Sequence, residues 1–169
     1  MTMSLIKDTV VFQSSASYHP AICCLIAFAP ATTLFSMMAV SRDPTASAAE
    51  KQHAVRALLW TTLAIVIVFA LVMPKRYELT SQATLKVVTW LGFTWNFENV
   101  ISANDEITIW SEWGRAKWKF AVDLGRRVAL RRRNAWDVLI TPRDPKGFVV
   151  AVRQVVNNQE SMAENLVSA

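Results

Sequence analysis

Few side chains in this sequence are of the types that catalysis or metal binding requires. The two histidines, His19 and His53, lie far apart in the sequence, and neither has a cysteine or carboxylate at a metal-ligand spacing. The adjacent acids Asp105 and Glu106 point apart in a helix and in a strand, so they do not form a general acid–base pair. The four glycines form no phosphate-binding loop. We therefore expect a protein that is not an enzyme and that holds no cofactor and no metal.

The two cysteines, Cys23 and Cys24, are adjacent and lie inside an uncharged apolar run. Neighbouring residues of a helix point about 100° apart, so the two thiols cannot form a disulfide with each other at normal geometry. Two interpretations stay open, namely small apolar side chains within a membrane and acylation near a membrane surface. The rest of the chain has no cysteine, so its fold does not depend on an oxidising compartment.

Arginine is concentrated in one short stretch of the second half of the chain. The five arginines of this stretch are Arg126, Arg127, Arg131, Arg132 and Arg133. In a strand, alternation directs Arg131 and Arg133 to one face and Arg132 to the other, so the five do not form a single patch. Three interpretations stay open: a solvated hairpin with Asp123 and Asp137 as local partners, a contact with anionic lipid, and a contact with an acidic protein partner.

All but one of the seven tryptophans follow Lys75. Trp95 and Trp136 occupy alternating apolar positions, so we expect them in the core. Other tryptophans share the polar stretch 110–119 with basic residues, and we expect at least one of them to be partly exposed. Exposed tryptophan beside arginine is typical of protein-interface hot spots and also of membrane-interface belts. We favour a protein contact, and its candidate residues are Trp110, Trp113, Arg115, Lys117 and Trp118.

The elements that position these side chains begin with two uncharged apolar runs, residues 20–40 and 57–73. A helix of about 20 residues crosses the ~30 Å hydrocarbon core of a membrane. The first run is long enough, and the second is at the short limit, with basic residues at both ends that can snorkel to the surface. Residues 47–56 lack proline and glycine and can extend the second helix by roughly two or three turns. We expect a two-helix transmembrane hairpin over residues 20–74; the alternative for the first run is a cleaved signal peptide.

Residues 75–156 have the pattern of a water-soluble antiparallel β domain. Short β-branched and aromatic segments recur at 76–80, 84–90, 93–100, 107–110, 118–122, 127–132 and 136–140. Leu91–Gly92 and Asn134–Ala135 are suited to tight turns between such segments. The spacing predicts a bent antiparallel sheet, either a small barrel or a sandwich.

A helix is predicted to follow the last of these strands. Asp144 is a candidate N-cap and Pro145 a candidate first helical residue. Apolar residues then recur at helical spacing up to Val156, which gives the helix one apolar face. We expect a polar tail over residues 1–19 and a frayed tail over residues 157–169.

Three segments carry a resemblance to a known family. Arg76–Tyr77 open the stretch RYELT, which fits the pattern R-Y-x-V/L-T, and Trp95–Phe97 fit W-x-I/F. Val138–Phe148 read VLITPRDPKGF, which fits V-L-I-S/T-P-R/K-D-x-x-x-F. On these residues the sequence resembles the short bacterial pleckstrin-homology-like (PH-like) membrane proteins. The resemblance covers residues 12–156 and departs from the family at 110–119, where the usual Ser/Pro-rich segment is missing.

The resemblance implies a membrane α+β protein, in which a transmembrane helical hairpin is followed by a small antiparallel β PH-like domain closed by a C-terminal α-helix. Related domains occur in assembly proteins of bacterial photosynthetic reaction-centre complexes. We therefore expect a non-enzymatic accessory or assembly subunit of a larger integral membrane complex, photosynthetic or respiratory. Membrane lipids and other transmembrane helices are its expected partners, whereas nucleic acid and small-molecule substrates are not.

The net charge of +5 adds little to this expectation, because a basic domain suits anionic lipid and acidic protein alike. Cations near the ends of the two apolar runs are almost evenly divided between the two sides. The resemblance and the cysteine-free basic domain favour the inner (cytoplasmic) membrane, with the PH-like domain and both termini in the cytoplasm. The alternative function is a stand-alone module that binds anionic lipid at the membrane surface. A stress or transport regulator is a third possible function, which no residue favours.

Overall fold

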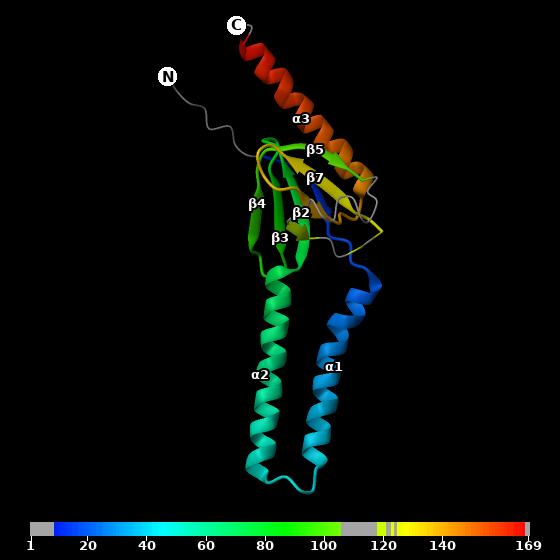
Figure 1. The fold of residues 1–169 in the computed structure, drawn as a ribbon, viewed down its shortest axis with the longest axis vertical. Coiled ribbons are helices and arrows are strands. Elements are labelled where there is room, and N and C mark those ends of the chain that lie inside the picture. Colours follow the sequence, from blue (N-terminus) through cyan, green and yellow to red (C-terminus); the bar gives the residue numbers. More distant parts are fainter. Residues whose placement is uncertain (1–8, 106–117, 121–122, 124, 168–169) are drawn as a thin grey trace, which may run out of the picture. The chain divides into compact units, whose positions relative to one another are not determined.

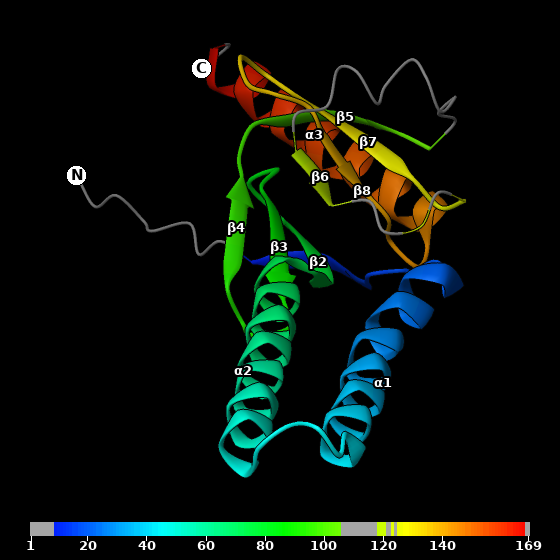
Figure 2. The ribbon, with the colours of Figure 1, turned by 60° about the horizontal axis from the view of Figure 1, so that its bottom comes forward.

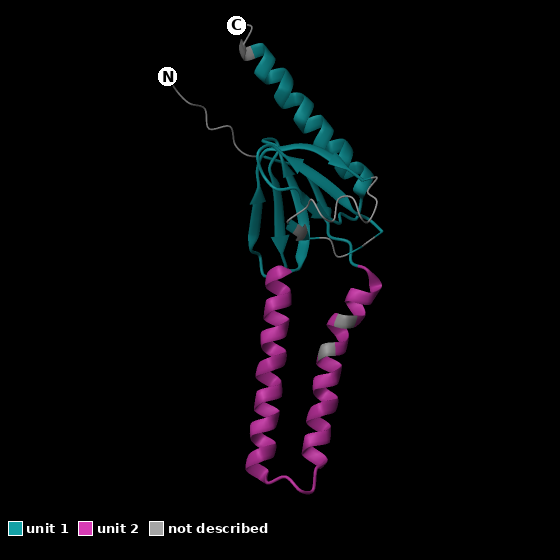
Figure 3. Ribbon diagram, in the orientation of Figure 1, with its two compact units in different colours: residues 1–18, 73–169 teal, residues 19–72 magenta. Residues whose placement is uncertain are grey.

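The computed structural model describes residues 9–105, 118–120, 123 and 125–167 of the chain (Figure 1). The chain divides into two compact units (Figure 3). Residues 19–72 form the hairpin unit, which consists of two helices. Residues 1–18 and 73–169 form the sheet unit, which contains every strand that the structure describes and the last helix. The sheet unit is therefore built from two stretches of sequence that flank the hairpin.

The hairpin unit contains α1 (Pro20–Arg42) and α2 (Ala48–Val72), which run antiparallel beside each other (Figures 1 and 2). The side-chain oxygens of Thr33 in α1 and Thr62 in α2 are 2.6 Å apart and share a hydrogen bond. Both helices are long and apolar enough to cross a membrane. None of the residues of α2 is buried, and most of its large apolar side chains from Leu59 to Val72 are exposed.

The second helix begins well before the apolar run at 57–73. The backbone N–H of Glu50 donates to Ser47 Oγ (3.3 Å), and the N–H of Ser47 donates to the Glu50 carboxylate (2.8 Å). This reciprocal capping box satisfies N–H groups that the first turn of a helix leaves unpaired. The predicted extension of the second helix through residues 47–56 is confirmed.

The first sheet of the sheet unit includes a strand that precedes the hairpin. Its strands, in spatial order, are β1 (Val10–Ser15), β2 (Pro74–Thr80), β3 (Leu85–Thr89) and β4 (Thr94–Phe97). All neighbours are antiparallel, and Ser15 of β1 lies opposite Arg76 of β2. The prediction of a tail over residues 1–19 is therefore corrected. Its apolar patch, Val10–Phe12, is too short to indicate a strand, and its partner strand lies beyond the whole hairpin in the sequence.

The second sheet contains one parallel pair. Its strands, in spatial order, are β5 (Val100–Asn104), β7 (Val128–Arg132), β8 (Val138–Ile140) and β6 (Trp118–Phe120). The pairs β5–β7 and β7–β8 are antiparallel, but β6 and β8 are parallel. The expectation of an entirely antiparallel domain is wrong at this pair, because β6 joins the sheet beside β8 and not beside the strand that follows it in sequence. The strand expected at 107–110 lies outside the described residues.

Two predicted turns are confirmed. The N–H of Gly92 donates to the carbonyl of Thr89 (3.1 Å), and the N–H of Thr89 donates to the carbonyl of Phe93 (2.9 Å). Gly92 has φ +84°, a value that glycine adopts without strain. Asn134, between β7 and β8, also has a positive φ of 56°, which asparagine tolerates better than most residues.

The core lies between the two sheets and α3 (Pro145–Val167). Phe148, Val152 and Val155 of α3 are buried. The helix lies along β5 (Figure 2) and also contacts β1 and β2. The ring of Phe148 meets that of Phe12 edge to face, with centroids 5.6 Å apart, so the strand before the hairpin contributes to the core. The layout of two apolar helices, largely antiparallel sheets and a C-terminal helix is the α+β arrangement that the sequence predicts.

The first residue of α3 agrees with the prediction, but its last residue does not. Asp144 Oδ1 accepts a hydrogen bond from the N–H of Gly147 (3.0 Å), so Asp144 is the N-cap that the sequence indicates. The helix continues to Val167, whereas the sequence predicts a frayed tail from residue 157. Residues 157–167 contain no proline or glycine and include several good helix formers, which explains the extension.

Candidate functional site

Four aromatic rings from two strands that are not neighbours in either sheet form a cluster on the sheet unit. Trp95 and Phe97 come from β4, and Trp118 and Phe120 come from β6. The ring centroids of Trp95 and Trp118 are 5.9 Å apart, and those of Phe97 and Phe120 are 5.6 Å apart. Phe97 also meets Trp118 edge to face at 5.9 Å. These distances suit aromatic packing, and we call the four residues the aromatic cluster.

Strand alternation explains why the four rings meet. Residues two apart in a strand share a face, so each strand contributes a pair of rings to the same side. On β4, Trp95 lies opposite Val87 and Phe97 lies opposite Leu85, both of which are buried. The inner face of the first sheet therefore extends through β4 into the aromatic cluster.

The aromatic cluster is buried at one end and open at the other. Phe97 and Phe120 are buried, whereas Trp95 is 43% and Trp118 is 42% exposed. The two phenylalanines tie the cluster to the core, and the two tryptophans present apolar surface to the outside. Large aromatic side chains that are held rigidly and half exposed are suited to binding another molecule.

The aromatic cluster joins the outermost described strands of the two sheets. Among the described residues, β4 is the outermost strand of the first sheet and β6 is the outermost strand of the second. The two strands meet through their rings, but the sheet orders do not pair them. Each therefore has one edge whose backbone N–H and C=O groups have no strand partner in the described part of the chain. Such edges can accept an added strand.

A buried tyrosine supports the cluster from within. Tyr77 of β2 donates a hydrogen bond from its hydroxyl to the carbonyl of Phe120 (2.8 Å) and accepts one from the N–H of Thr141 (3.4 Å). Its burial raises the pKa of the Tyr77 hydroxyl well above its usual value, because the phenolate would lose its hydration. The Tyr77 hydroxyl therefore stays neutral and links the two sheets through its hydrogen bonds.

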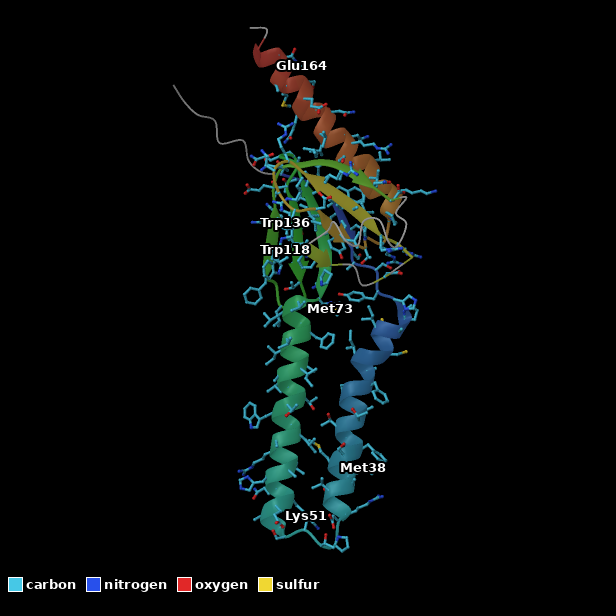
Figure 4. All side chains as sticks on the ribbon, in the orientation of Figure 1. Met38, Lys51, Met73, Trp118, Trp136 and Glu164 are labelled. Carbon is cyan, nitrogen blue, oxygen red and sulfur yellow. The ribbon has the colours of Figure 1, made fainter. Side chains whose placement is uncertain are left out.

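The predicted partner-binding residues lie mostly outside the described part of the chain. Trp118, which is labelled in Figure 4, is partly exposed, as expected, and belongs to the aromatic cluster. The other predicted members, Trp110, Trp113, Arg115 and Lys117, lie outside the described residues.

The prediction that Trp95 and Trp136 are core residues is wrong. Trp95 does lie on the inner face, but β4 is an outermost strand and leaves much of the ring uncovered. Trp136 is about half exposed because it precedes β8, so strand alternation does not apply to it. The sequence signal for Trp95 was its alternation with Phe97, which identifies the face of a strand but not its place in the sheet.

The five arginines differ in their burial and in their partners. Arg127 is buried, and Arg126 donates from Nη1 to the carbonyl of Arg143 (3.3 Å). Arg131 and Arg133 are exposed. Arg132 is half buried and reaches the ring of Phe97 in the aromatic cluster.

Arg132 binds backbone groups beside the cluster. Its Nε donates to the carbonyl of Glu98 (2.8 Å), and its Nη1 is 3.4 Å from the carbonyl of Trp136. The guanidinium carbon is 5.4 Å from the ring centroid of Phe97, a cation–π distance. Arg132 thus covers one side of the aromatic cluster, and its guanidinium group is engaged by these contacts within the sheet unit.

The chemistry available at the aromatic cluster is binding through apolar surface and backbone hydrogen bonds. No group of three or more His, Cys, Asp or Glu side chains gathers in the part of the chain that the structure describes. The cluster itself contains no nucleophile, acid or base. No protein-family model matches this chain, and neither the curated proteins nor the solved structures include a match to it.

Proposed function

We propose that this protein is a membrane-anchored, non-catalytic interaction subunit with a PH-like domain, and that its aromatic cluster binds an extended segment of a partner membrane protein. It acts as an accessory or assembly subunit of a larger integral membrane complex, photosynthetic or respiratory. Its sheet unit and both termini lie on the cytoplasmic side of the inner membrane.

The composition and exposure of α1 and α2 support the membrane anchor. A helix that is apolar all round needs either a protein core or a lipid environment. Leu63, Val66 and Phe69 of α2 and Phe35 of α1 are all exposed within the described chain. A bilayer is the environment in which this much exposed apolar surface is stable.

The pairing of β1 with β2 supports a hairpin in the membrane. β1 precedes α1 and β2 follows α2, and the two strands are hydrogen-bonded neighbours. The chain before α1 and the chain after α2 therefore lie on the same side of any membrane that the helices cross. An even number of crossings satisfies this requirement, and one crossing by each helix is the simplest case.

The observation that carries the proposed binding role is the half-exposed pair Trp95 and Trp118 above the buried pair Phe97 and Phe120. Binding energy in protein interfaces is concentrated at tryptophan, tyrosine and arginine side chains in well-packed surroundings. The strand edges on either side offer backbone hydrogen bonds to an extended segment. A partner segment that adds a strand beside β4 or β6 would cover the tryptophans with its own apolar side chains.

Purification of the tagged full chain in mild detergent tests this proposal. We expect an integral membrane protein to remain bound to the parent chain. Trp118→Ala and Trp95→Ala should each weaken this retention by about thirtyfold, the effect of losing about 2 kcal/mol at a hot spot. Trp136→Ala is the matched control, since Trp136 is an exposed tryptophan that is not one of the four rings of the aromatic cluster, and this variant should retain the partner.

Two results would contradict the proposal. One is a parent chain that purifies alone or with lipid only. The other is a partner that stays bound to the Trp95→Ala/Trp118→Ala double variant as tightly as to the parent chain.

A further inference from the structure

We infer that the turn between β3 and β4, residues 90–93, is a second membrane contact, which lies in the head-group layer of the bilayer that the hairpin spans, beside a cationic groove for the phosphates of anionic lipids. This β3–β4 turn is distinct from the aromatic cluster and from the five arginines. The inference rests on the proposed membrane anchor and assigns a lipid surface to a part of the sheet unit.

The β3–β4 turn exposes more apolar surface than a turn in water ordinarily does. Trp90, Leu91 and Phe93 are between 51% and 58% exposed. Turns at the surface of soluble proteins favour glycine, proline, asparagine, aspartate and serine, and only Gly92 is of that kind here. Three large apolar side chains gathered on one tight turn form an exposed patch of the kind that marks a protein or membrane contact.

The chain connection keeps the turn close to the end of α2. The helix ends at Val72, and Met73 alone separates it from Pro74, the first residue of β2 (Figure 4). Pro74 lies opposite Thr89, the last residue of β3 before the turn. Two residues span at most about 7.6 Å, and facing strand residues are about 5 Å apart. Thr89 therefore lies within roughly 13 Å of the last residue of α2, whatever the orientation of the two units, and the turn follows directly after it.

This distance matters because the polar layer of a membrane is thin. The head-group region on each side of the hydrocarbon core is roughly 5–7 Å thick. If α2 spans the core, its last residue lies at the boundary of this layer. A turn whose side chains add several ångströms of reach can then contact the layer without any change in the fold.

The side chains around the turn are those found at membrane interfaces. Trp90 Nε1 donates to the hydroxyl of Tyr18 (2.9 Å), and that hydroxyl donates to the carbonyl of Pro74. Tyr18 is the residue before His19, the N-cap of α1. Tryptophan and tyrosine are enriched where a protein passes from lipid to water, and here they link the chain segments that enter and leave the hairpin.

Basic residues flank the same turn. Lys75 Nζ is 5.5 Å from the ring centroid of Trp90, a cation–π distance. Together with Arg76 and Lys86 it lines a groove of about 450 Å³ on the outer face of the first sheet. Glu78 is the only acid in the groove lining, and it is paired with Arg76 at 2.6 Å. The groove thus has an excess of positive charge, which suits the phosphate of an anionic lipid.

The test uses the full chain, carrying Cys23→Ser and Cys24→Ser, reconstituted into phosphatidylcholine vesicles with and without phosphatidylglycerol. One fluorescent label that responds to polarity is attached at Leu91→Cys, and a second preparation carries it at Phe93→Cys to guard against a local disturbance. Val66→Cys in α2 reports on the hydrocarbon core, and Asn157→Cys on α3 reports on water. Lipids with a nitroxide near the head group and lipids with one deep in the acyl chain quench the label according to its depth.

The expected result is that head-group nitroxides quench the labels at Leu91→Cys and Phe93→Cys strongly, with a shift of their emission to shorter wavelength. Deep nitroxides should quench the label at Val66→Cys. Neither the head-group nitroxides nor the deep nitroxides should quench the label at Asn157→Cys. Phosphatidylglycerol should increase the quenching at Leu91→Cys, and Lys75→Gln/Lys86→Gln should remove that increase. An unaltered increase in this variant would overturn the assignment of the groove.

The outcomes separate this inference from the proposed anchor. If the label at Val66→Cys is quenched while those at Leu91→Cys and Phe93→Cys behave like the one at Asn157→Cys, the anchor stands and the inference is wrong. If the label at Val66→Cys also behaves as in water, the anchor itself fails, and the inference fails with it.

Discussion

The hydroxyl of Tyr77 donates a hydrogen bond to the carbonyl oxygen of Phe120, and the two oxygens are 2.8 Å apart. Tyr77 lies in β2 of the first sheet and Phe120 in β6 of the second, so this bond joins the sheets. Because β6 has only three residues, it makes few other backbone hydrogen bonds. The Tyr77 hydroxyl therefore holds the strand that presents Trp118 at the aromatic cluster.

Tyr77→Phe should lower the free energy of unfolding by about 1–2 kcal/mol, because the variant leaves the buried Phe120 carbonyl without its donor. Retention of the partner should also fall, since β6 loses a constraint on the position of Trp118. Thermal unfolding in detergent, followed by near-ultraviolet circular dichroism, measures the first effect. An unchanged midpoint in Tyr77→Phe would show that the bond between the sheets contributes nothing to stability.

Alkaline pH should destabilise the parent chain more than Tyr77→Phe. Burial raises the pKa of Tyr77 in the folded protein above the usual value of about 10. Above pH 10 the unfolded state has therefore lost a proton that the folded state retains, and stability falls as pH rises. The contribution is about 1.4 kcal/mol per pH unit until the folded-state pKa is reached. Unfolding midpoints of both proteins between pH 9 and about pH 11 measure it, and parallel curves would contradict it.

Thr89→Val should increase the free energy of unfolding by about 1 kcal/mol. Thr89 is fully buried, and its hydroxyl has no hydrogen-bond partner among the described residues, so valine of similar shape removes a desolvated polar group. The matched control is Thr80→Val, because Thr80 is equally buried but its hydroxyl accepts from the N–H of Thr84 (3.3 Å). Thr80→Val should lower stability, and equal effects of the two substitutions would refute this explanation.

Arg132→Gln should lower the free energy of unfolding by about 1 kcal/mol, since it removes the hydrogen bond to the Glu98 carbonyl and the cation above Phe97. Arg133→Gln, one residue away on the exposed face, should change stability by no more than about 0.5 kcal/mol. Chemical denaturation of both variants measures the difference. If Arg133→Gln costs as much as Arg132→Gln, net charge and not the local contact is the cause.

Gly147→Ala should not give the gain of about 1 kcal/mol that alanine ordinarily brings to a helix. An added Cβ would overlap Asp144 Oδ2 and lie 2.9 Å from Asp144 Cγ, so the N-cap would have to move away. In an Asp144→Ala background, Gly147→Ala should become stabilising by about 1 kcal/mol. A double-mutant cycle measures this coupling, and additive effects would mean that the cap does not restrict residue 147.

The helices of this protein could be predicted from the sequence because their signals are local. Uncharged apolar runs identify α1 and α2, the stretch 47–56 without proline or glycine extends α2, and Asp144–Pro145 mark the start of α3. Each signal depends on residues within one or two helical turns. The turns at Gly92 and Asn134 are local in the same sense, because a positive φ favours only a few residue types.

The strand order of the sheets could not be predicted in the same way, because no local pattern specifies which strand lies beside another. Val10–Phe12 look like a short apolar patch until β2 is found to lie beside them, beyond the hairpin. The parallel pairing of β6 with β8 likewise joins segments on either side of β7. A strand reveals which face of it is apolar, but not which strand lies next to it.

The candidate site shows the same division between local and long-range information. The spacing of Trp95 and Phe97 places them on one face of a strand, and the neighbours of Trp118 in the sequence are polar. That β4 and β6 are the outermost described strands, so that the rings of both form one half-open cluster, follows from the pairing of distant segments. Exposure depends on which residues cover a side chain, and the covering residues here come from distant parts of the chain.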